Sequence, residues 1–428
     1  MGELWTAEKF RSFFHGRFNA CKPYVFMLLK SAVVAGGAGI VCGLVGTLFH
    51  YAVDKATDIR LQLPWLLYLL PVAGIVIAWL YHIAGLDNDR GTNLILESIR
   101  ENKRPPLRLA GLIFIGTVLT HLCGGSSGRE GAALQIGGSL GSGLGRCLRL
   151  SEKQEHILIM CGMSGLFSAL FGTPVTATLF SMEVISVGIF HYSAFLPCIC
   201  SSLVSYKISL FFGVQPVAYH INLLNSQGFD LTWRIALLAL ACALVSILFC
   251  KAMHLSSYLY RRFLTNAYLR AAVGGGLVVI ITLLIGTRDY NGAGMDIVGL
   301  ALGGHARPEA FLLKILLTAL TLGAGFKGGE IVPAFFIGST FGCVAGQFLG
   351  LDPSFAAALG LVSVFCGVVN CPIASIILSI ELFGSGNVLA FAFACAISYL
   401  MSGSYSLYSS QRITYSKLEP TFINAKTK

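Results

Sequence analysis

The sequence predicts an all-α polytopic membrane protein built from many tilted and broken helices. Of its 428 residues, 55% are hydrophobic and only 12% are charged, whereas soluble domains carry about 25% charged residues. Apolar runs close to the ~20 residues that a helix needs to span a bilayer recur throughout the chain. The 49 glycines favour closely packed helices over a lipid-exposed barrel.

The apolar segments form two halves, which we place at residues 24–213 and 235–410. Residues 1–23 are charged and aromatic, which predicts an amphipathic helix on the cytoplasmic membrane surface. Residues 214–234 are a linker that contains a polar stretch, and residues 411–428 form a short cytoplasmic tail. Glycine and proline interrupt many segments, which is typical of a transport site between repeats. The apolar segments cover residues 24–53, 63–86, 107–123, 131–148, 157–171, 174–189, 194–212, 235–253, 269–285, 311–325, 332–349, 355–369, 372–383 and 389–401.

The net charge of +10 follows the positive-inside rule and does not indicate a nucleic-acid partner. The basic residues gather in short connections between apolar segments, which places these connections and both termini in the cytoplasm. We therefore expect an integral protein of the inner or plasma membrane, in contact with lipid. The clusters are Arg100, Lys103, Arg104 and Arg108; Arg146, Arg149 and Lys153; Arg261 and Arg262; and Lys417, Lys426 and Lys428.

The 13 cysteines predict neither a metal site nor a cofactor. None forms a CxxC pair, and most lie in apolar runs, where cysteine acts as a small hydrophobic residue.

A membrane-embedded hydrolase is the rival class of protein. No HExxH motif occurs, and the one tempting nucleophile pair is His121 with Ser126 or Ser127. A histidine and a serine separated by about one helical turn are common by chance. We therefore do not expect an enzyme.

An internal repeat relates the two halves. Residues 172–183, GTPVTATLFSME, match residues 370–381, NCPIASIILSIE, position by position. Upstream, residues 128–138, GREGAALQIGG, parallel residues 329–339, GEIVPAFFIGS. Each half therefore carries a glycine break with a charged residue, followed by a proline-headed helix that ends in glutamate. Two such copies facing each other would aim helix N-termini at one point near the membrane midplane.

The glycine break of the first half, residues 123–145, contains Arg129 and Glu130 between apolar runs. An ionisable residue inside a bilayer is costly and suggests a functional site. A helix that starts near Gly131 would point its positive dipole end at the break, which favours an anion. The alternative is a glycine-rich helix contact whose Arg–Glu pair reaches the membrane surface.

These motifs resemble those of the CLC family of anion channels and proton-coupled anion antiporters. Residues 128–131, GREG, are similar to the family's GREGP motif, and residues 329–333, GEIVP, to its GxFxP motif. Residues 91–93, GTN, fall where the family has GSGIP, and Tyr408 resembles the tyrosine that bonds the central anion. The resemblance covers residues 24–410 and implies a CLC-type inverted repeat. It also implies a homodimer with one pore in each subunit, and Glu130 as the gating and proton-coupling glutamate. The anion-binding residues that it implies are Thr92, Asn93, Gly128, Arg129, Gly131, Gly329, Ile331, Val332 and Tyr408.

Where this sequence departs from the motifs of the chloride transporters, it resembles the fluoride-exporting branch of the family. Gly91 replaces the anion-binding serine, and Asn93 stands two positions on. Glu330 lies in the second motif as a candidate internal partner of Glu130, and Val184 stands where chloride antiporters keep an internal glutamate. We expect an antiporter that exports fluoride in exchange for protons. A chloride/proton antiporter or a passive anion channel is the alternative.

Three of these residues have structural alternatives. Asn93 precedes a helical stretch and could cap its N-terminus. Glu330 could form a loop ion pair with Lys327, and Tyr408 could belong to an interfacial aromatic belt. The glutamates that end the two repeated helices are expected to be structural or to face the cytoplasm.

Overall fold

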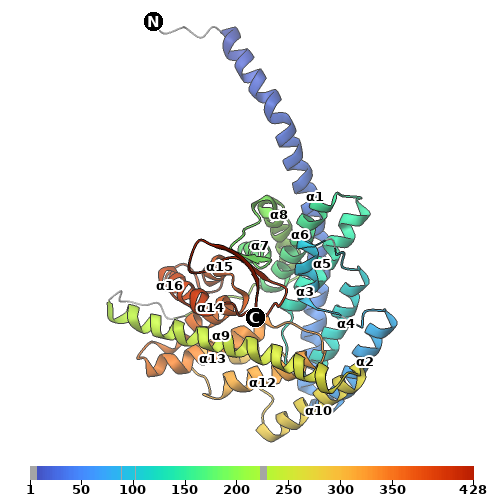
Figure 1. The fold of residues 1–428 in the computed structure, drawn as a ribbon, viewed down its shortest axis with the longest axis vertical. Helices are drawn as coiled ribbons and strands as arrows, with labels where there is room; N and C mark the ends of the chain where they lie inside the picture. Colours follow the sequence, from blue (N-terminus) through green and yellow to red (C-terminus); the bar gives the residue numbers. More distant parts are fainter. Residues whose placement is uncertain (1–6, 88, 102, 222–228) are drawn as a thin grey trace.

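The computed structural model describes residues 7–428, apart from residues 88, 102 and 222–228. This part of the chain contains sixteen α-helices and one three-stranded sheet, which confirms the helical fold predicted from hydropathy. In Figure 1 the first half, blue to green, lies mainly on the right, and the second half, yellow to red, lies mainly to the left and below.

The elements follow one another in two comparable series. The first half contains α1 (Ala7–Gln62), the 3₁₀ helix η1 (Pro64–Leu69), α2 (Leu70–Ile83), α3 (Thr92–Arg100), α4 (Arg108–Leu122), α5 (Glu130–Cys147), α6 (Glu152–Phe171), α7 (Pro174–Glu183), β1 (Ser186–Val187), η2 (Tyr192–Ala194) and α8 (Phe195–Phe211). The second half contains α9 (Phe229–Phe263), α10 (Ala267–Ile285), α11 (Met295–Leu302), α12 (Ala310–Gly323), α13 (Ile331–Phe348), α14 (Pro353–Val369), α15 (Pro372–Phe383), α16 (Val388–Met401), β2 (Arg412–Tyr415) and β3 (Phe422–Lys426).

Six stretches of the described chain are long and apolar enough to cross a bilayer. Large apolar side chains on the outer faces of these helices are more than half exposed, among them Leu48, Leu244 and Leu284. Such surfaces suit contact with lipid and would be unstable in water. The stretches are Met27–Gln62, Pro64–Ile83, Tyr192–Phe211, Leu231–Phe263, Ala267–Ile285 and Ile331–Phe348.

Two of the segment limits drawn from the sequence fall inside helices. Helix α1 runs unbroken past residue 23 and projects from the body of the molecule toward the N-terminus (Figure 1). Helix α9 begins at Phe229, within the residues assigned to the linker. Helical hydrogen bonding therefore continues from the apolar spans into the flanking polar residues, a continuity that hydropathy does not report.

A direct backbone contact joins the two glycine breaks. Gly128 and Gly329 form an isolated antiparallel bridge. The N–H of Gly128 donates to the carbonyl of Gly329 at 2.7 Å, and the N–H of Gly329 donates to that of Gly128 at 2.6 Å. The two repeated motifs thus meet in opposite directions, as expected for an inverted repeat.

Each of the glutamates near the ends of the repeated helices caps the N-terminus of the other repeated helix. The carboxylate of Glu183, on α7, accepts from the N–H groups of Ile373 and Ala374 at the start of α15, at 3.2 and 2.9 Å. Glu381, on α15, accepts from the two corresponding N–H groups of α7, at 2.9 and 2.8 Å. A helix N-terminus leaves such donors unpaired and favours a negative charge. Both glutamates are therefore structural. The two caps are reciprocal, which follows from the two-fold relation between the halves.

Glycine pairs allow the helices that follow each break to cross in backbone contact. Helix α5 packs on α6 at Gly137 and Gly162, and α13 packs on α14 at Gly338 and Gly360. A Cβ atom at any of these four positions would overlap the carbonyl oxygen of the opposite glycine on the partner helix. Small residues at such crossings are the usual basis of helix association in membranes.

The C-terminal tail folds back on the helices as a small sheet. Strand β1 pairs parallel with β2, which pairs antiparallel with β3. Gln411 is fully buried and donates to the carbonyls of Val184 and Val369, at 2.8 and 2.9 Å. The residues assigned to a tail in the sequence are thus an ordered part of the fold.

Lys417 anchors this tail. Its Nζ donates to Asn370 Oδ1 at 2.5 Å, to the carbonyl of Tyr399 at 2.7 Å and to Ser402 Oγ at 3.1 Å. Burial lowers the pKa of Lys417 to about 8, so the ammonium group still carries the protons for three hydrogen bonds at neutral pH. These bonds tie the tail to the ends of α14 and α16.

Replacement of Lys417 by methionine is expected to loosen the tail while keeping the length of the side chain. The buried acceptors would lose their donor, which costs about 1–3 kcal/mol. Limited proteolysis followed by mass spectrometry should detect faster cleavage between β2 and β3. Lys426→Met, on the exposed strand β3, is the matched control and should leave cleavage unchanged. Equal cleavage rates in both variants would show that Lys417 does not anchor the tail.

Candidate functional site

The N-termini of two helices meet at the bridge between the two glycine breaks. Helix α5 starts at Glu130 and α13 at Ile331, each two residues after its glycine of the Gly128–Gly329 bridge. The first N–H groups of each helix have no partner within that helix, and the helix dipoles add positive potential at the same point. The structure therefore brings the two predicted motifs together in an arrangement that favours an anion.

Glu130 places its own carboxylate at this position. The residue is only 1% exposed, and its Oε2 accepts the backbone N–H of Arg129 at 3.1 Å. A surface-seeking Arg–Glu pair is therefore the wrong interpretation of this motif. The carboxylate therefore engages a backbone donor at the start of α5.

Arg129 is directed mainly toward α1. Its Nη1 lies 2.6 Å from Asp54 Oδ1, whereas its Nε lies 3.6 Å from Glu130 Oε1. His50 Nε2 contacts the other oxygen of the same Asp54 carboxylate at 3.1 Å. The guanidinium is thus held beside the start of α5 by Asp54 of α1.

Glu330 faces the first half rather than Lys327. Lys327 Nζ pairs with Asp89 Oδ2 at 2.7 Å and lies 4.0 Å from the ring centroid of Tyr81. The loop ion pair considered for Glu330 is therefore wrong. Its Oε1 instead lies 3.5 Å from the hydroxyl of Thr92, which is within reach of a weak hydrogen bond.

Glycine at position 131 makes room for Glu330. A Cβ atom at Gly131 would lie 2.8 Å from Glu330 Oε2 and 2.8 Å from the Cα of Gly329. Gly128 is equally constrained, because a Cβ there would lie 2.8 Å from the side chain of Val332 and 3.1 Å from Glu130 Oε2. The glycines of the motif thus let two acidic side chains and two backbones approach one another.

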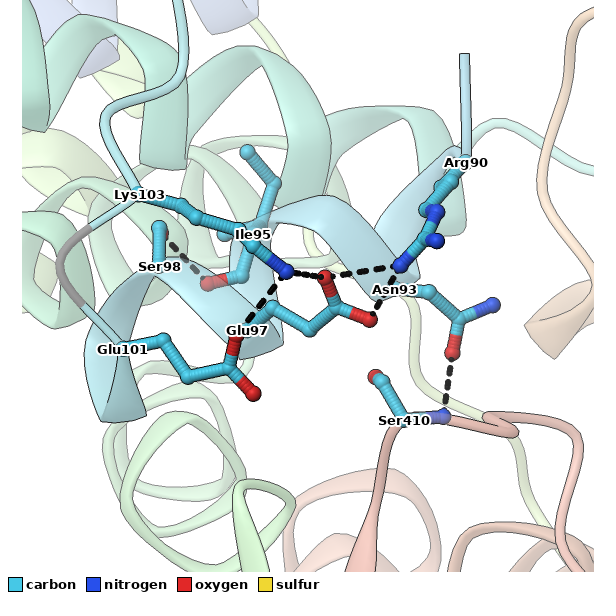
Figure 2. A network of polar contacts seen from close by, with 8 residues as sticks. All are labelled: Arg90, Asn93, Ile95, Glu97, Ser98, Glu101, Lys103 and Ser410. Atoms are coloured by element: carbon cyan, nitrogen blue, oxygen red, sulfur yellow. Dashed lines mark hydrogen bonds and ion pairs between the residues drawn. The ribbon is translucent and has the colours of Figure 1, made fainter. Parts of the chain in front are cut away.

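Asn93 does not cap its helix. The N-cap of α3 is Gly91, with φ of +59°, a conformation that favours glycine. Asn93 lies in the first turn, and its Oδ1 accepts the N–H of Ser410 at 2.8 Å. Figure 2 shows the Nδ2 end of the amide pointing away from Ser410. This end has no protein partner among the described residues, so it remains a donor available to an anion.

Ion pairs hold α3 in place (Figure 2). Glu97 accepts from Arg90 Nη1 at 2.8 Å and from Lys103 Nζ at 2.8 Å. Lys103 also pairs with Glu101 at 2.8 Å, and this hydrogen bond holds the pKa of Glu101 below its usual range. These pairs therefore link α3 to the residues that immediately precede and follow it.

Tyr408 is a buried tyrosine with an unpaired hydroxyl. It is 1% exposed, so the interfacial-belt interpretation is wrong. Its hydroxyl has no hydrogen-bond partner among the described residues, although a buried hydroxyl normally has one. Its backbone carbonyl accepts from Thr427 Oγ1 at 2.9 Å. The fold thus holds in place a donor that lacks an acceptor, which suits a transported anion.

The remaining positions considered in the sequence are buried. Ile331 and Val332 are fully buried in the first turn of α13. Val184, at the position where chloride antiporters keep an internal glutamate, is fully buried. The carbonyl of Val184 is held by Gln411 at 2.8 Å. Ser126, from the pair considered for a hydrolase, hydrogen-bonds instead to the carbonyl of Tyr290 at 2.8 Å and contacts the Thr318 hydroxyl at 3.1 Å.

Sequence reasoning missed three polar residues at the site. Asp54 binds Arg129, and Asp89 binds both Lys327 and the N–H of Gly91. Gln135 contacts Thr92 from α5. Gln135 carried the clearest available signal, since it is a lone amide in a run of small and apolar residues. The side-chain partners of the two aspartates, Arg129 for Asp54 and Lys327 for Asp89, are too far away in sequence for any local pattern to reveal them.

Comparisons with known proteins agree with this geometry. The sequence model described as "Voltage gated chloride channel" matches residues 73–403. A chloride/fluoride channel protein of Pseudomonas syringae pv. tomato is 34% identical over 402 residues, which make up 92% of this chain and 88% of that relative.

Solved structures are similar across both halves. The crystal structure of a CLC-type fluoride/proton antiporter is 32% identical and has a TM-score of 0.87, covering 90% of this chain and 98% of its own. A slow cyanobacterial Cl⁻/H⁺ antiporter is 19% identical, with a TM-score of 0.74 over 87% of this chain and 94% of its own. The second similarity concerns the fold alone.

Proposed function

Because the chain belongs to the voltage-gated chloride channel family, we propose that it is a proton-coupled antiporter that exports fluoride in exchange for protons. The observation that carries this proposal is the position of Glu130. A titratable carboxylate, buried between two helix N-termini, occupies a backbone donor that an anion would need. Transport, rather than catalysis on a substrate, follows from such competition.

The exchange works by replacement of one negative charge by another. Ionised Glu130 closes the site because its carboxylate takes the N–H of Arg129. Protonation removes the charge, so the side chain is released and an anion binds in its place. Protons that enter the cell down their gradient would then drive the anion outward, one for one.

Fluoride is the anion that the donors suit best. It is small, strongly hydrated and a strong hydrogen-bond acceptor, so its dehydration must be offset by direct donors. The Tyr408 hydroxyl and Nδ2 of Asn93 are donors without protein partners among the described residues, and the Oδ1 of Asn93 accepts the N–H of Ser410. Val184 removes the separate internal glutamate, which leaves Glu130 and Glu330 to carry protons along the anion path. The names of the chloride/fluoride channel protein and the fluoride/proton antiporter support the same choice.

Purified protein in liposomes tests both parts of the proposal. A fluoride gradient should drive proton movement, a chloride gradient should drive much less, and cells that lack the protein should become sensitive to fluoride. Equal coupled fluxes of the two anions would favour a chloride/proton antiporter. Anion flux without proton movement would favour a passive channel.

Asn93 is expected to determine selectivity. Asn93→Ala should lower the ratio of fluoride to chloride flux about tenfold while reducing total flux less, because a direct donor to fluoride is lost. Asn93→Asp is the matched variant: it retains an acceptor for the Ser410 N–H but lacks the amide donor. If Asn93→Asp keeps the wild-type ratio, the amide donor has no role in selectivity.

We also propose a homodimer with one pore in each subunit and both termini in the cytoplasm. Exposed apolar side chains on α8 and α16, including Leu203 and Phe393, would form part of the contact. Cysteine crosslinking in lipid should trap a dimer, and recovery of monomer alone would contradict this assignment.

A further inference from the structure

Gln135 is a buried amide that the transport steps above do not use. It lies one helical turn after Gly131 on α5 and is only 6% exposed. Burial of an amide without hydrogen bonds costs roughly 1–3 kcal/mol in proteins. The hydrogen-bond partners of this amide therefore indicate why a glutamine stands at this position.

The two hydrogen bonds of Gln135 fix the orientation of its amide. Its Nε2 lies 3.3 Å from the carbonyl oxygen of Gly131 and 3.2 Å from Thr92 Oγ1. A backbone carbonyl can only accept, so the NH₂ group must be the end that faces both atoms. The amide consequently donates to the hydroxyl of Thr92.

That bond in turn directs the hydroxyl proton of Thr92. A hydroxyl has one proton, and the lone pair facing Gln135 is already engaged. The proton is then free to point at Glu330 Oε1, 3.5 Å away. The second oxygen, Oε2, lies on the side of Gly131 at the start of α5.

We infer that Gln135 is a positioning residue that determines which oxygen of Glu330 receives the transported proton. Thr92 keeps Oε1 as a hydrogen-bond acceptor, so the proton is taken up at Oε2, the oxygen next to the helix that begins with Glu130. This inference rests on the proposed proton-coupled transport. The other titratable side chains at this junction are Glu130 on α5 and Tyr408 in the loop after α16.

The test is a double-mutant cycle in liposomes, with fluoride-driven proton flux measured against pH. Gln135→Met removes the donor at similar volume, and Thr92→Val removes the hydroxyl at similar volume. Each should move the pH of half-maximal exchange upward, by about one unit for Thr92→Val, because the ionised form of Glu330 loses a hydrogen bond. The double variant should shift no further than Thr92→Val alone, since Gln135 acts through Thr92.

Two control variants separate positioning from packing. Thr92→Ser keeps the hydroxyl and should retain the wild-type pH profile. Ser139→Ala, one turn further along α5 and equally buried, should also leave the profile unchanged. Additive shifts in the double variant, or a slower rate at every pH without a shift, would overturn the inference.

An infrared titration distinguishes failure of this inference from failure of the proposed function. The absorption of protonated Glu330, identified by its loss in Glu330→Gln, can be followed against pH in the purified protein without any transport. If wild-type protein moves no protons, the proposed function fails. The infrared midpoint in Gln135→Met then still supports the positioning role if it shifts and refutes it if it does not.

Discussion

Replacement of Glu130 by glutamine is expected to abolish proton movement driven by a fluoride gradient. Glutamine has the shape of the protonated carboxyl group but cannot release a proton, so the titration that links the two ions is lost. Because glutamine carries no negative charge to compete for the N–H of Arg129, anion flux should continue. The expected loss of coupling is at least 100-fold, the scale on which positioned acid–base groups act.

The measurement compares proton and fluoride fluxes in the same liposomes. Glu152→Gln is the matched control, because Glu152 is also the first residue of its helix but is exposed to solvent. It should couple like wild type. If Glu130→Gln still pumps protons, another residue is the gate, and Glu330 would be the next to test.

Replacement of Gly360 by alanine is expected to prevent normal folding. The added methyl group would lie on the carbonyl oxygen of Gly338 and 2.8 Å from the Cα of Gly342. These atoms are backbone, so no side chain can move to accommodate it. Overpacking typically costs about 1–3 kcal/mol and occasionally more, and α13, which carries half of the proposed anion site, would be displaced.

Thermal unfolding and the monodisperse fraction on size exclusion would measure this effect. Gly276→Ala makes the same change within α10, where a Cβ atom would meet nothing within 4 Å. That variant should be neutral or slightly more stable, because alanine favours helix. Gly162→Ala should reproduce the defect of Gly360→Ala in the first half, where its methyl group would meet the carbonyl of Gly137. Normal folding of Gly360→Ala would show that the helix crossing is looser than the structure indicates.

The sequence by itself determined the class of protein, the repeat and the two motifs. These features depend on local signals: hydropathy over about 20 residues, glycine and proline that interrupt helices, and the spacing within GREG and GEIVP. It also indicated Glu130, because a charge inside an apolar run is expensive wherever the chain goes. Because the motifs are local, the resemblance to the CLC family was also visible before any contact was known.

Only the tertiary structure decided how the polar residues are paired. Lys327 pairs with Asp89 rather than with nearby Glu330, and Glu183 accepts the N–H of Ile373, which lies 190 residues later. Gln135 reaches Thr92 only because α3 lies against α5. Hydrogen bonds and ion pairs act over about 3 Å, whereas these partners are separated by tens to hundreds of residues along the chain. Which of them meet is set by the packing of whole helices, and no local pattern in the sequence records that outcome.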